Sequence, residues 1–478
     1  MDFLPPGARV HLIGIGGTGM ASLAGLLKES GFEVSGSDAN IYPPMSTMLQ
    51  ELGIPVKTPY GPRNLEPRPD LVIIGNAMSR GNQEVEETLD QGLPYESMAS
   101  ALKRLCLDGR RCVVVAGTHG KTTTTSMLAW ILEVASQQDA ALRPGFLIGG
   151  KPENFPNGFR AQPERGGLFV IEGDEYDTAF FDKGPKFMHY LPRSVVLTSV
   201  EYDHADIYPD LDSVKLAFKR LVNLVPASGV IVAMGDSPVV EECLAKAYCP
   251  VERYGKGSNC MWRAEGIESY EEWTRFEVYR GNTRFLRADL KASGEHNVMN
   301  ALGAVAMAAR LGVPERVLRQ ALTSFKGVKR RLEIRGEQEG ITVIDDFAHH
   351  PTAIRETLKA VRKRFPGRQI WAIVEPRSNS LRRRVFEDEL VEALEEADRV
   401  TLSGVFQGAN IPDKERLEPG RIVTRLLREG VKAATFNTAN EIIPQVVSQA
   451  KKGDVLVVMS NGGFDGIHEN LLAKLGGH

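Results

Sequence analysis

The chain has few cysteines, no long apolar run and no excess of charge, and each absence excludes a class of protein. The five cysteines in 478 residues form no C-x-x-C pair and no zinc spacing, and their odd number fits reduced thiols. No segment approaches the roughly 18 consecutive apolar residues of a membrane span, and the first residues lack the basic flank and cleavage site of a signal peptide. With 58 Lys and Arg against 61 Asp and Glu, the net charge of −3 does not favour a nucleic-acid-binding surface. We therefore expect a cytoplasmic protein without membrane or nucleic-acid partners, and no pattern indicates an oligomeric state.

The length predicts about three domains at roughly 150 residues each. Strand and helix signals alternate, which favours an α/β protein with parallel sheets. A polar segment at 108–111 and a basic segment at 326–331 separate three such regions, so we place the domains at 1–108, 109–326 and 327–478. Short alternating runs at 260–290 are typical of antiparallel strands within the second domain. The strands expected in the three domains are Arg9–Gly14, Glu33–Ser37 and Asp70–Gly75; Cys112–Ala116, Leu168–Glu172, Ser194–Thr198 and Val230–Ala233; and Ile341–Asp345, Gln369–Val374, Arg399–Leu402 and Asp454–Met459. The helices expected are Gly16–Ser30, His296–Leu311 and Pro314–Ser324.

A phosphate-binding loop is the strongest local pattern in the sequence. An apolar strand continues into Gly-Thr-His-Gly-Lys-Thr and then into a helix, and the helix amino terminus adds partial positive charge. Lys121 would reach the β- and γ-phosphates of ATP and the Thr122 hydroxyl would ligate Mg²⁺. The match to G-x-x-x-x-G-K-[ST] is incomplete because Val115 stands at the first glycine, and the alternative is a glycine turn without a ligand. The residues expected to bind ATP here are Gly117, Thr118, His119, Gly120, Lys121, Thr122 and Thr123.

Acidic residues and a histidine follow two of the expected strands. Glu172 lies in IEGDEYD and His204 in EYDHADIYP. The carboxyl ends of parallel strands meet at one edge of a sheet, where sites form. A carboxylate oxygen suits Mg²⁺, and a histidine can complete a second metal site beside phosphates. The alternatives are a solvated acidic loop and a hydrogen-bonded loop histidine.

A second glycine cluster lies near the amino terminus. Gly14-Ile-Gly16-Gly17-Thr18-Gly19 satisfies G-x-G-x-x-G between a strand and a helix, and Asp38 ends the next expected strand. This pattern is typical of dinucleotide binding, so an NAD(P)-linked oxidoreductase is one interpretation. The same geometry suits the diphosphate of a UDP-sugar, which is a second interpretation. A tight turn without a ligand is the third interpretation.

Several of these motifs together resemble the Mur ligase family in order and spacing. They are Gly117–Thr123, Glu172–Asp177, Asp203-His204, Gly294–Asn300 (GEHNVMN) and Asp345–Pro351 (DDFAHHP), and GIGGTGM looks like the family's UDP-N-acetylmuramate-binding domain. The resemblance covers essentially the whole chain. Within the family, SGSDANIYPPMST, EPRSNS and MSNGGFDGIH are most similar to the branch that uses a murein tripeptide.

The resemblance implies a three-domain architecture with Rossmann-like outer domains around a central ATP-binding P-loop domain. It implies an ATP- and Mg²⁺-dependent ligase, with one or two ions, that joins L-Ala-γ-D-Glu-meso-diaminopimelate to UDP-N-acetylmuramate through an acyl phosphate in peptidoglycan recycling. The alternatives are the L-alanine-adding ligase of the same family, the oxidoreductase, and a switch protein that hydrolyses ATP without ligation. A reaction of this kind relies mainly on positioning and charge neutralisation.

The resemblance also implies roles for individual residues. Lys121, Glu172 and His204 would be catalytic, with Thr122, Glu172 and His204 at the metal. His296, Asn297 and Asn300 would contact adenine, although the two amides at a helix start would alternatively cap backbone. Arg331 would meet a phosphate and Asp346 the ribose. The UDP-sugar would contact Gly14, Gly16, Gly17, Thr18, Gly19 and Asp38.

Two further predictions concern Lys219 and the acceptor. Lys219 resembles in position a carbamylated lysine of some family members, but we expect it on a solvated basic face. Arg377, Ser378, Asn379 and Asn461 follow expected strands of the third domain and would bind the peptide, with Arg377 holding a carboxylate and the backbone N–H groups of the segment around Asn461 accommodating the chain. The alternative for Arg377 is an ion pair with Glu375 or Asp388.

Overall fold

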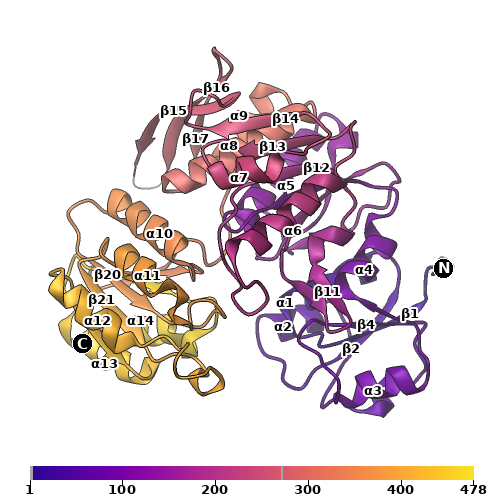
Figure 1. The fold of residues 1–478 in the computed structure, drawn as a ribbon, viewed down its shortest axis with the longest axis horizontal. Helices are drawn as coiled ribbons and strands as arrows, with labels where there is room; N and C mark the ends of the chain where they lie inside the picture. Colours follow the sequence, from indigo (N-terminus) through magenta and orange to yellow (C-terminus); the bar gives the residue numbers. More distant parts are fainter. Residues whose placement is uncertain (1–3, 271–272, 478) are drawn as a thin grey trace.

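Three large sheets follow one another along the chain (Figure 1). The computed structural model describes residues 4–270 and 273–477. Figure 1 shows the amino-terminal sheet (indigo) and the carboxyl-terminal sheet (yellow) on either side of the central one (magenta). The expected α/β class is thereby confirmed. Among the described residues, no helix has the length and hydropathy needed to cross a membrane.

The amino-terminal sheet is parallel and has the order β3-β2-β1-β4-β5. The strand order reverses at β1, which is where sheets of this kind bind ligands. The first helix begins at Thr18 rather than at Gly16, because the intervening glycines form the turn that follows β1. The elements are β1 Arg9–Ile13, α1 Thr18–Glu29, β2 Glu33–Ser37, α2 Met45–Glu51, β3 Val56–Lys57, β4 Leu71–Ile74, α3 Gln83–Asp90, β5 Tyr95–Ser97 and α4 Met98–Leu102.

The central sheet has ten strands in the order β17-β16-β15-β14-β13-β12-β6-β9-β7-β8. Its middle is parallel, while β15 to β17 pair antiparallel, as the alternating runs at 260–290 predicted. Its strands are β6 Arg111–Ala116, β7 Gly145–Leu147, β8 Phe159–Arg160, β9 Leu168–Gly173, β12 Pro192–Leu197, β13 Val230–Met234, β14 Val251–Gly255, β15 Trp262–Ser269, β16 Thr274–Arg280 and β17 Thr283–Leu290. The helices are α5 Lys121–Ser136, α6 Leu211–Leu224, α7 Pro238–Leu244, α8 Glu295–Arg310 and α9 Glu315–Ser324, and a separate hairpin comprises β10 Asp177–Ala179 and β11 Asp182–Pro185.

The carboxyl-terminal sheet has the order β18-β19-β23-β20-β21-β22, and only β18 runs antiparallel to its neighbour. Apolar clusters cover both of its faces. Its strands are β18 Glu333–Gln338, β19 Ile341–Asp346, β20 Ile370–Val374, β21 Arg399–Ser403, β22 Lys432–Phe436 and β23 Val455–Met459. Its helices are α10 Pro351–Arg364, α11 Glu387–Leu394, α12 Pro419–Arg428, α13 Ala439–Gln449 and α14 Ile467–Leu475.

The amino-terminal and central sheets share one hydrophobic core. A single buried cluster extends from Val10 and Leu12 of β1 through α1 to β6, β9 and α6. At its centre, Gly25 of α1 faces Phe159 of β8 so closely that a Cβ on Gly25 would lie 2.1 Å from Phe159 Cζ. Glycine is therefore needed in mid-helix to let the helix dock against the ring.

We expect Gly25→Ala to destabilise the protein by about 1–3 kcal/mol, because the added methyl group overpacks the buried Phe159 ring. Helix propensity alone predicts the opposite sign. The matched control is Gly420→Ala in α12, where a Cβ meets no atom within 4 Å, and there we expect a gain of up to about 1 kcal/mol. Urea unfolding of the two variants measures both effects. Equal stabilisation by the two substitutions would contradict this account of the interface.

Candidate active site

Three adjacent strands bring their carboxyl ends together at the middle of the central sheet. Strand β6 pairs in parallel with β9 on one side and with β12 on the other. The register places Glu172 of β9 beside Val115, and Leu197 of β12 beside Ala116. The loops that follow these strands carry the phosphate loop, the acidic run and His204, so the predicted convergence at one sheet edge is present.

Two glycines give the loop after β6 its shape. Gly117 has φ +137° and Gly120 has φ +80°, values that L side chains rarely adopt. A Cβ on Gly117 would lie 2.2 Å from Thr198 Oγ1, and one on Gly120 would lie 2.3 Å from Asn300 Oδ1. The loop is therefore pressed between the loop after β12 and the start of α8.

The amides at the start of α5 are the ones left to receive a phosphate. The N–H groups of Thr118 and His119 donate to Ser199, through its carbonyl at 3.0 Å and its hydroxyl at 2.9 Å. No side chain caps α5, and the first-turn N–H groups of a helix have no partner within it. The half-buried Thr123 lies in this first turn. An anion at this terminus would meet both these groups and the helix dipole.

Lys121 lies inside the site, where it forms a buried ion pair. Its Nζ is 3.0 and 2.9 Å from the two oxygens of Glu175, and it also donates to the Gly117 carbonyl at 2.6 Å. Glu175 is 2% exposed and Lys121 14%. Burial acts to lower the pKa of Lys121, but the carboxylates of Glu175, Asp174 and Glu172 outweigh it and raise the pKa. The ammonium group is thus held charged, as phosphate binding requires.

The expected metal ligands fall into two neighbouring groups. Thr122 Oγ1 donates to Glu172 Oε1 at 2.8 Å, and the other Glu172 oxygen accepts from the Gly149 amide at 2.8 Å. His204 instead pairs with Glu175, its Nε2 lying 3.4 Å from Oε1. The sequence predicted that His204 would serve a second metal site, and the described structure puts its ring with Asp174 and Glu175, whose donor atoms all lie within 4.8 Å of one another.

The residues expected near adenine lie at the start of α8. Asn300 Nδ2 donates to Asn297 Oδ1 at 3.3 Å, Asn300 Oδ1 accepts from Thr124 at 3.3 Å, and Asn297 Nδ2 donates to the Ser293 carbonyl at 2.8 Å. The two amides do share a face, and Asn297 contacts backbone at Ser293, although no side chain caps α8. Burial and the charge of Arg331 lower the pKa of His296 to about 4, and its Nδ1 is buried without a hydrogen bond.

Asp346 and Arg331 lie across from α8 on the carboxyl-terminal part. Asp346 is buried, and its oxygens accept from the amides of Leu332 and Ala348, both at 2.8 Å, so it joins the segment before β18 to the loop after β19. Burial raises the pKa of this carboxyl group. Arg331 lies with its guanidinium 5.1 Å from the centre of the Phe347 ring. Their contacts to ribose and phosphate stay predictions.

The amino-terminal glycine turn opens on a pocket shared with the central sheet. Asp38 Oδ2 accepts from the Gly16 amide at 2.8 Å and so stabilises the turn itself, and Gly14 takes φ +82°. A cavity of about 260 Å³ is lined by residues of both parts, among them Gly17, Thr18 and Gly19 from the turn and Glu172, Asp174 and Lys186 from the central part. This cavity therefore runs from the first glycine cluster to the acidic residues beside the phosphate loop.

A larger hollow of about 810 Å³ lies at the ends of β21 and β22. All of its described lining residues come from the carboxyl-terminal part of the chain. Volume alone therefore does not locate the site.

The residues expected to bind the peptide lie at the ends of β20 and β23. Arg377 pairs with Glu375 at 3.4 Å, which is the first of its two alternative partners, while Asp388 pairs with Arg425. The Arg377 guanidinium also stacks on the Phe406 ring, 3.7 Å from the ring centre. Asn461 Oδ1 is buried without a hydrogen-bond partner among the described residues. The Arg377 guanidinium is therefore already paired within the protein, while the Asn461 side-chain oxygen can still accept a hydrogen bond.

Polar contacts join this end of the carboxyl-terminal sheet to the central sheet. Asn379 donates to Asp206 Oδ2 at 2.7 Å and Ser380 to Asp203 Oδ1 at 2.6 Å. Ser378 is buried and donates to the His349 carbonyl at 3.2 Å. Asn379 therefore spans the interface in this arrangement.

Lys219 is exposed on α6, as predicted.

The comparisons with known proteins agree with this arrangement. Residues 9–110 match the profile "Mur ligase family, catalytic domain", 115–308 the "Mur ligase middle domain", and 330–462 the "Mur ligase, glutamate ligase domain". The chain belongs to the Mur ligase family. The predicted resemblance and the three-domain Mur ligase fold are thereby confirmed, and the chain is an ATP-dependent ligase of this family.

Full-length relatives refine the comparison within the family. The chain is 43% identical to the UDP-N-acetylmuramate--L-alanyl-gamma-D-glutamyl-meso-2,6-diaminoheptandioate ligase of Escherichia coli, over 98% of both chains. It is 31% identical to the UDP-N-acetylmuramate--L-alanine ligase of Clostridium acetobutylicum, again over 98% of both. The structure of a murein peptide ligase from Psychrobacter arcticus superposes with a TM-score of 0.76 at 38% identity, covering 99% of each chain.

Sequence reasoning missed several residues of the site. Glu175 and Asp174 lay within the acidic motif, but only Glu172 received a role. Glu201, Tyr176 and Asp206 lay within the two quoted motifs but received no role, because their partners come from distant loops. A search for carboxylates following each strand end would have found Glu201, which lies after β12.

We expect Glu172→Gln to raise the Mg²⁺ concentration for half-maximal turnover by at least about tenfold. The amide removes the negative charge, while its oxygen still accepts from Thr122 or Gly149, so the fold is kept. A titration of activity against Mg²⁺ measures the change. Glu392→Gln, at an exposed carboxylate that pairs with Arg355, is the matched control. An unchanged Mg²⁺ requirement would remove Glu172 from the metal site.

Proposed function

We propose that the protein joins the tripeptide L-Ala-γ-D-Glu-meso-diaminopimelate to UDP-N-acetylmuramate at the expense of ATP, in peptidoglycan recycling. The observation that carries the proposal is the cavity that links the glycine turn after β1 to Glu172, Asp174 and Lys186. A UDP-sugar whose diphosphate rests on the turn would extend toward the phosphate loop. The relatives over the full chain length with the higher identity have this activity in their names.

The UDP-sugar side would be formed by Gly14, Gly16, Gly17, Thr18, Gly19 and Asp38. The turn is exposed at Gly17 and Thr18, where backbone N–H groups are accessible to a diphosphate. Asp38 supports this surface by holding the Gly16 amide. We assign Asp38 to the shape of the turn as much as to direct contact with the ligand.

ATP would bind at Gly117–Thr123, with adenine near His296, Asn297 and Asn300 and with Arg331 and Asp346 contributing from the carboxyl-terminal part. Thr122 and Glu172 offer oxygen donors 2.8 Å apart, a donor set that suits Mg²⁺. Bound Mg²⁺ would neutralise phosphate charge. Asp174, Glu175 and His204 form a second donor group that a second ion would use.

Lys121 must change partners for the reaction. Without nucleotide its charge is neutralised by Glu175, and a γ-phosphate brings negative charge to the same ammonium group. The chain would then position the lactyl carboxylate for transfer of the γ-phosphoryl group, which forms an acyl phosphate and releases ADP. The amino group of the peptide's L-Ala attacks the acyl carbon, loses a proton and displaces phosphate.

The acceptor would enter from the ends of β20 and β23. Arg377 can bind a carboxylate of the peptide with two parallel hydrogen bonds. Asn461 Oδ1 is unpaired and can accept a hydrogen bond from the peptide. Ser378 and Asn379 would complete the surface.

Arg330 and Leu332, at φ 60° and 51°, lie in the connection between the central and carboxyl-terminal parts. Such left-handed residues suit a hinge that closes over the substrates and excludes water.

We propose domains at 1–108, 109–326 and 327–478, each containing one large sheet. We also propose action in the cytoplasm on small substrates rather than on nucleic acid or membrane. All five cysteines are buried free thiols, namely Cys106, Cys112, Cys243, Cys249 and Cys260. Thiols of this kind suit a reducing compartment.

The acceptor is tested by competition. We expect the purified protein, given UDP-N-acetylmuramate, ATP and Mg²⁺ with equal amounts of tripeptide and L-alanine, to form mainly the UDP-linked tripeptide. Mass spectrometry of the UDP-linked products measures the ratio. A predominant L-alanine adduct would favour the other branch of the family, and ATP hydrolysis without either adduct would contradict ligation.

We expect Arg377→Lys to raise the KM for tripeptide about tenfold or more while the KM for ATP stays unchanged. Lysine keeps the charge opposite Glu375 but loses the bidentate geometry. Arg399→Lys is the matched control, because Arg399 stacks at the same 3.7 Å on an aromatic ring, that of Trp371. Initial rates with each substrate varied provide the measurement. Equal effects on both KM values would assign Arg377 a structural role only.

A further inference from the structure

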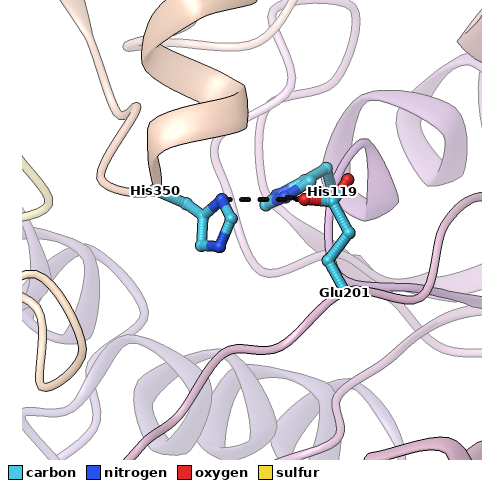
Figure 2. A group of neighbouring side chains, drawn as sticks. All are labelled: His119, Glu201 and His350. Carbon is cyan, nitrogen blue, oxygen red and sulfur yellow. Dashed lines mark ion pairs between the residues drawn. The ribbon is translucent and has the colours of Figure 1, made fainter. Parts of the chain in front are cut away.

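Two histidines and a glutamate converge beside the phosphate loop, at the junction of the central and carboxyl-terminal parts. His119 comes from the phosphate loop, Glu201 from the loop after β12, and His350 from the residue that precedes α10 (Figure 2). His119 Nε2 lies 3.4 Å from Glu201 Oε2, and His350 Nδ1 lies 3.9 Å from the same oxygen. Figure 2 shows both rings turned toward the carboxylate.

The hydrogen bonds around His350 leave its lone pair on Nδ1, the ring nitrogen 3.9 Å from Glu201 Oε2, and a metal ion here would replace the bond that Nδ1 accepts from the Thr352 amide. Its Nε2 lies 3.1 Å from the Tyr202 carbonyl, which can only accept, so this nitrogen carries the proton. Nδ1 then has the lone pair and accepts only a long bond of 3.3 Å from the Thr352 amide. A histidine that donates one N–H to a backbone carbonyl is the usual arrangement of a metal ligand.

The other two side chains are placed in the same way. His119 Nε2 is buried and has no hydrogen-bond partner among the described residues. Glu201 Oε2 accepts from the Thr352 hydroxyl at 2.6 Å, which orients the carboxylate. Glu201 is 36% exposed, so an ion from solvent can reach the centre.

We propose that His119, Glu201 and His350 bind a divalent transition cation of the zinc type. A tetrahedral zinc ion with bonds of about 2.1 Å separates its ligand atoms by about 3.4 Å. The three donor atoms lie within 4.8 Å of one another, so shifts of less than about an ångström complete the site. Two imidazoles and one carboxylate suit zinc rather than Mg²⁺, which prefers oxygen ligands. A water molecule would take the fourth position.

The position of the ion gives it a mechanical consequence. Its ligands come from the phosphate loop, from the loop after β12 and from the start of α10, so it fastens the carboxyl-terminal part to the central one. These two parts otherwise meet through polar contacts. Binding therefore slows the separation of the two parts and orders the loop that carries His119.

The test is calorimetric titration of Zn²⁺ into the full-length protein after chelator treatment and removal of the chelator. We expect Glu201→Gln and His350→Gln to weaken one binding event by at least about tenfold. His189→Gln, at a histidine that pairs only with the Asp182 carboxylate among described acidic groups, is the matched control and keeps the wild-type affinity. Glu175→Gln removes a donor from the Asp174–Glu175–His204 group, and we expect this variant to keep the wild-type affinity for Zn²⁺ at the site of His119, Glu201 and His350.

Two further readouts use the wild type and its exchange behaviour. Pulsed electron paramagnetic resonance of the Cu²⁺-loaded wild type should show two coordinated imidazoles, whereas the Asp174–Glu175–His204 group supplies one. Hydrogen exchange of residues 117–123 and 347–355 should slow with Zn²⁺ in the wild type and not in Glu201→Gln. Circular dichroism checks that the variants are folded. Equal Zn²⁺ affinity in all proteins, loss of binding only in Glu175→Gln, or a single imidazole in the wild type would each overturn the proposal.

Discussion

The parallel pairing of β6 with β9 and β12 is the constraint on which the site depends. Parallel strands end at the same sheet edge. The register sets Glu172 of β9 beside Val115 of β6, and Leu197 of β12 beside Ala116 of β6. The side chains proposed for ATP or metal binding in the central part lie at the end of β9, in the loops that leave this edge, in the first turn of α5, or in α8. The glycines of the phosphate loop are needed because these loops are tightly packed: a Cβ at Gly117 or Gly120 would overlap Thr198 or Asn300.

The two interfaces between the sheets differ in chemistry. The amino-terminal and central sheets share a buried apolar cluster, and separating them would expose that surface to water at a large cost in free energy. Loops of the central and carboxyl-terminal parts meet through hydrogen bonds of Thr352, Asn379 and Ser380 and a ring contact between Tyr202 and Phe386, without a buried cluster shared by the two sheets among the described residues. Water can replace such contacts, so movement of the carboxyl-terminal part costs less. A ligase that admits three substrates and then excludes water benefits from one fixed and one separable interface.

The Lys121–Glu175 pair links charge in the site to binding. A buried ammonium group without a partner would be strongly destabilising, and Glu175 supplies the partner while no phosphate is present. His204 also pairs with Glu175, so one carboxylate serves both cations. In the proposed function, a phosphate that pairs with Lys121 would leave Glu175 to His204 and to a metal ion. The exchange keeps the buried charges paired in both states.

The sequence by itself determined the α/β class, eleven strands of the three sheets to within two residues, and membership of the Mur ligase family, but it did not reveal β3, β5, β7, β8, β14, β18 or β22. Apolar runs, glycine turns and motif order are local properties of the chain, so reading along it suffices. Tertiary structure decided which carboxylate each cation meets. His204 pairs with Glu175, Asp38 after β2 holds the turn after β1, and Glu201 lies between two histidines from segments far apart in the chain. These contacts depend on how loops from different strands and different sheets pack against one another, and no local pattern along the sequence encodes that packing.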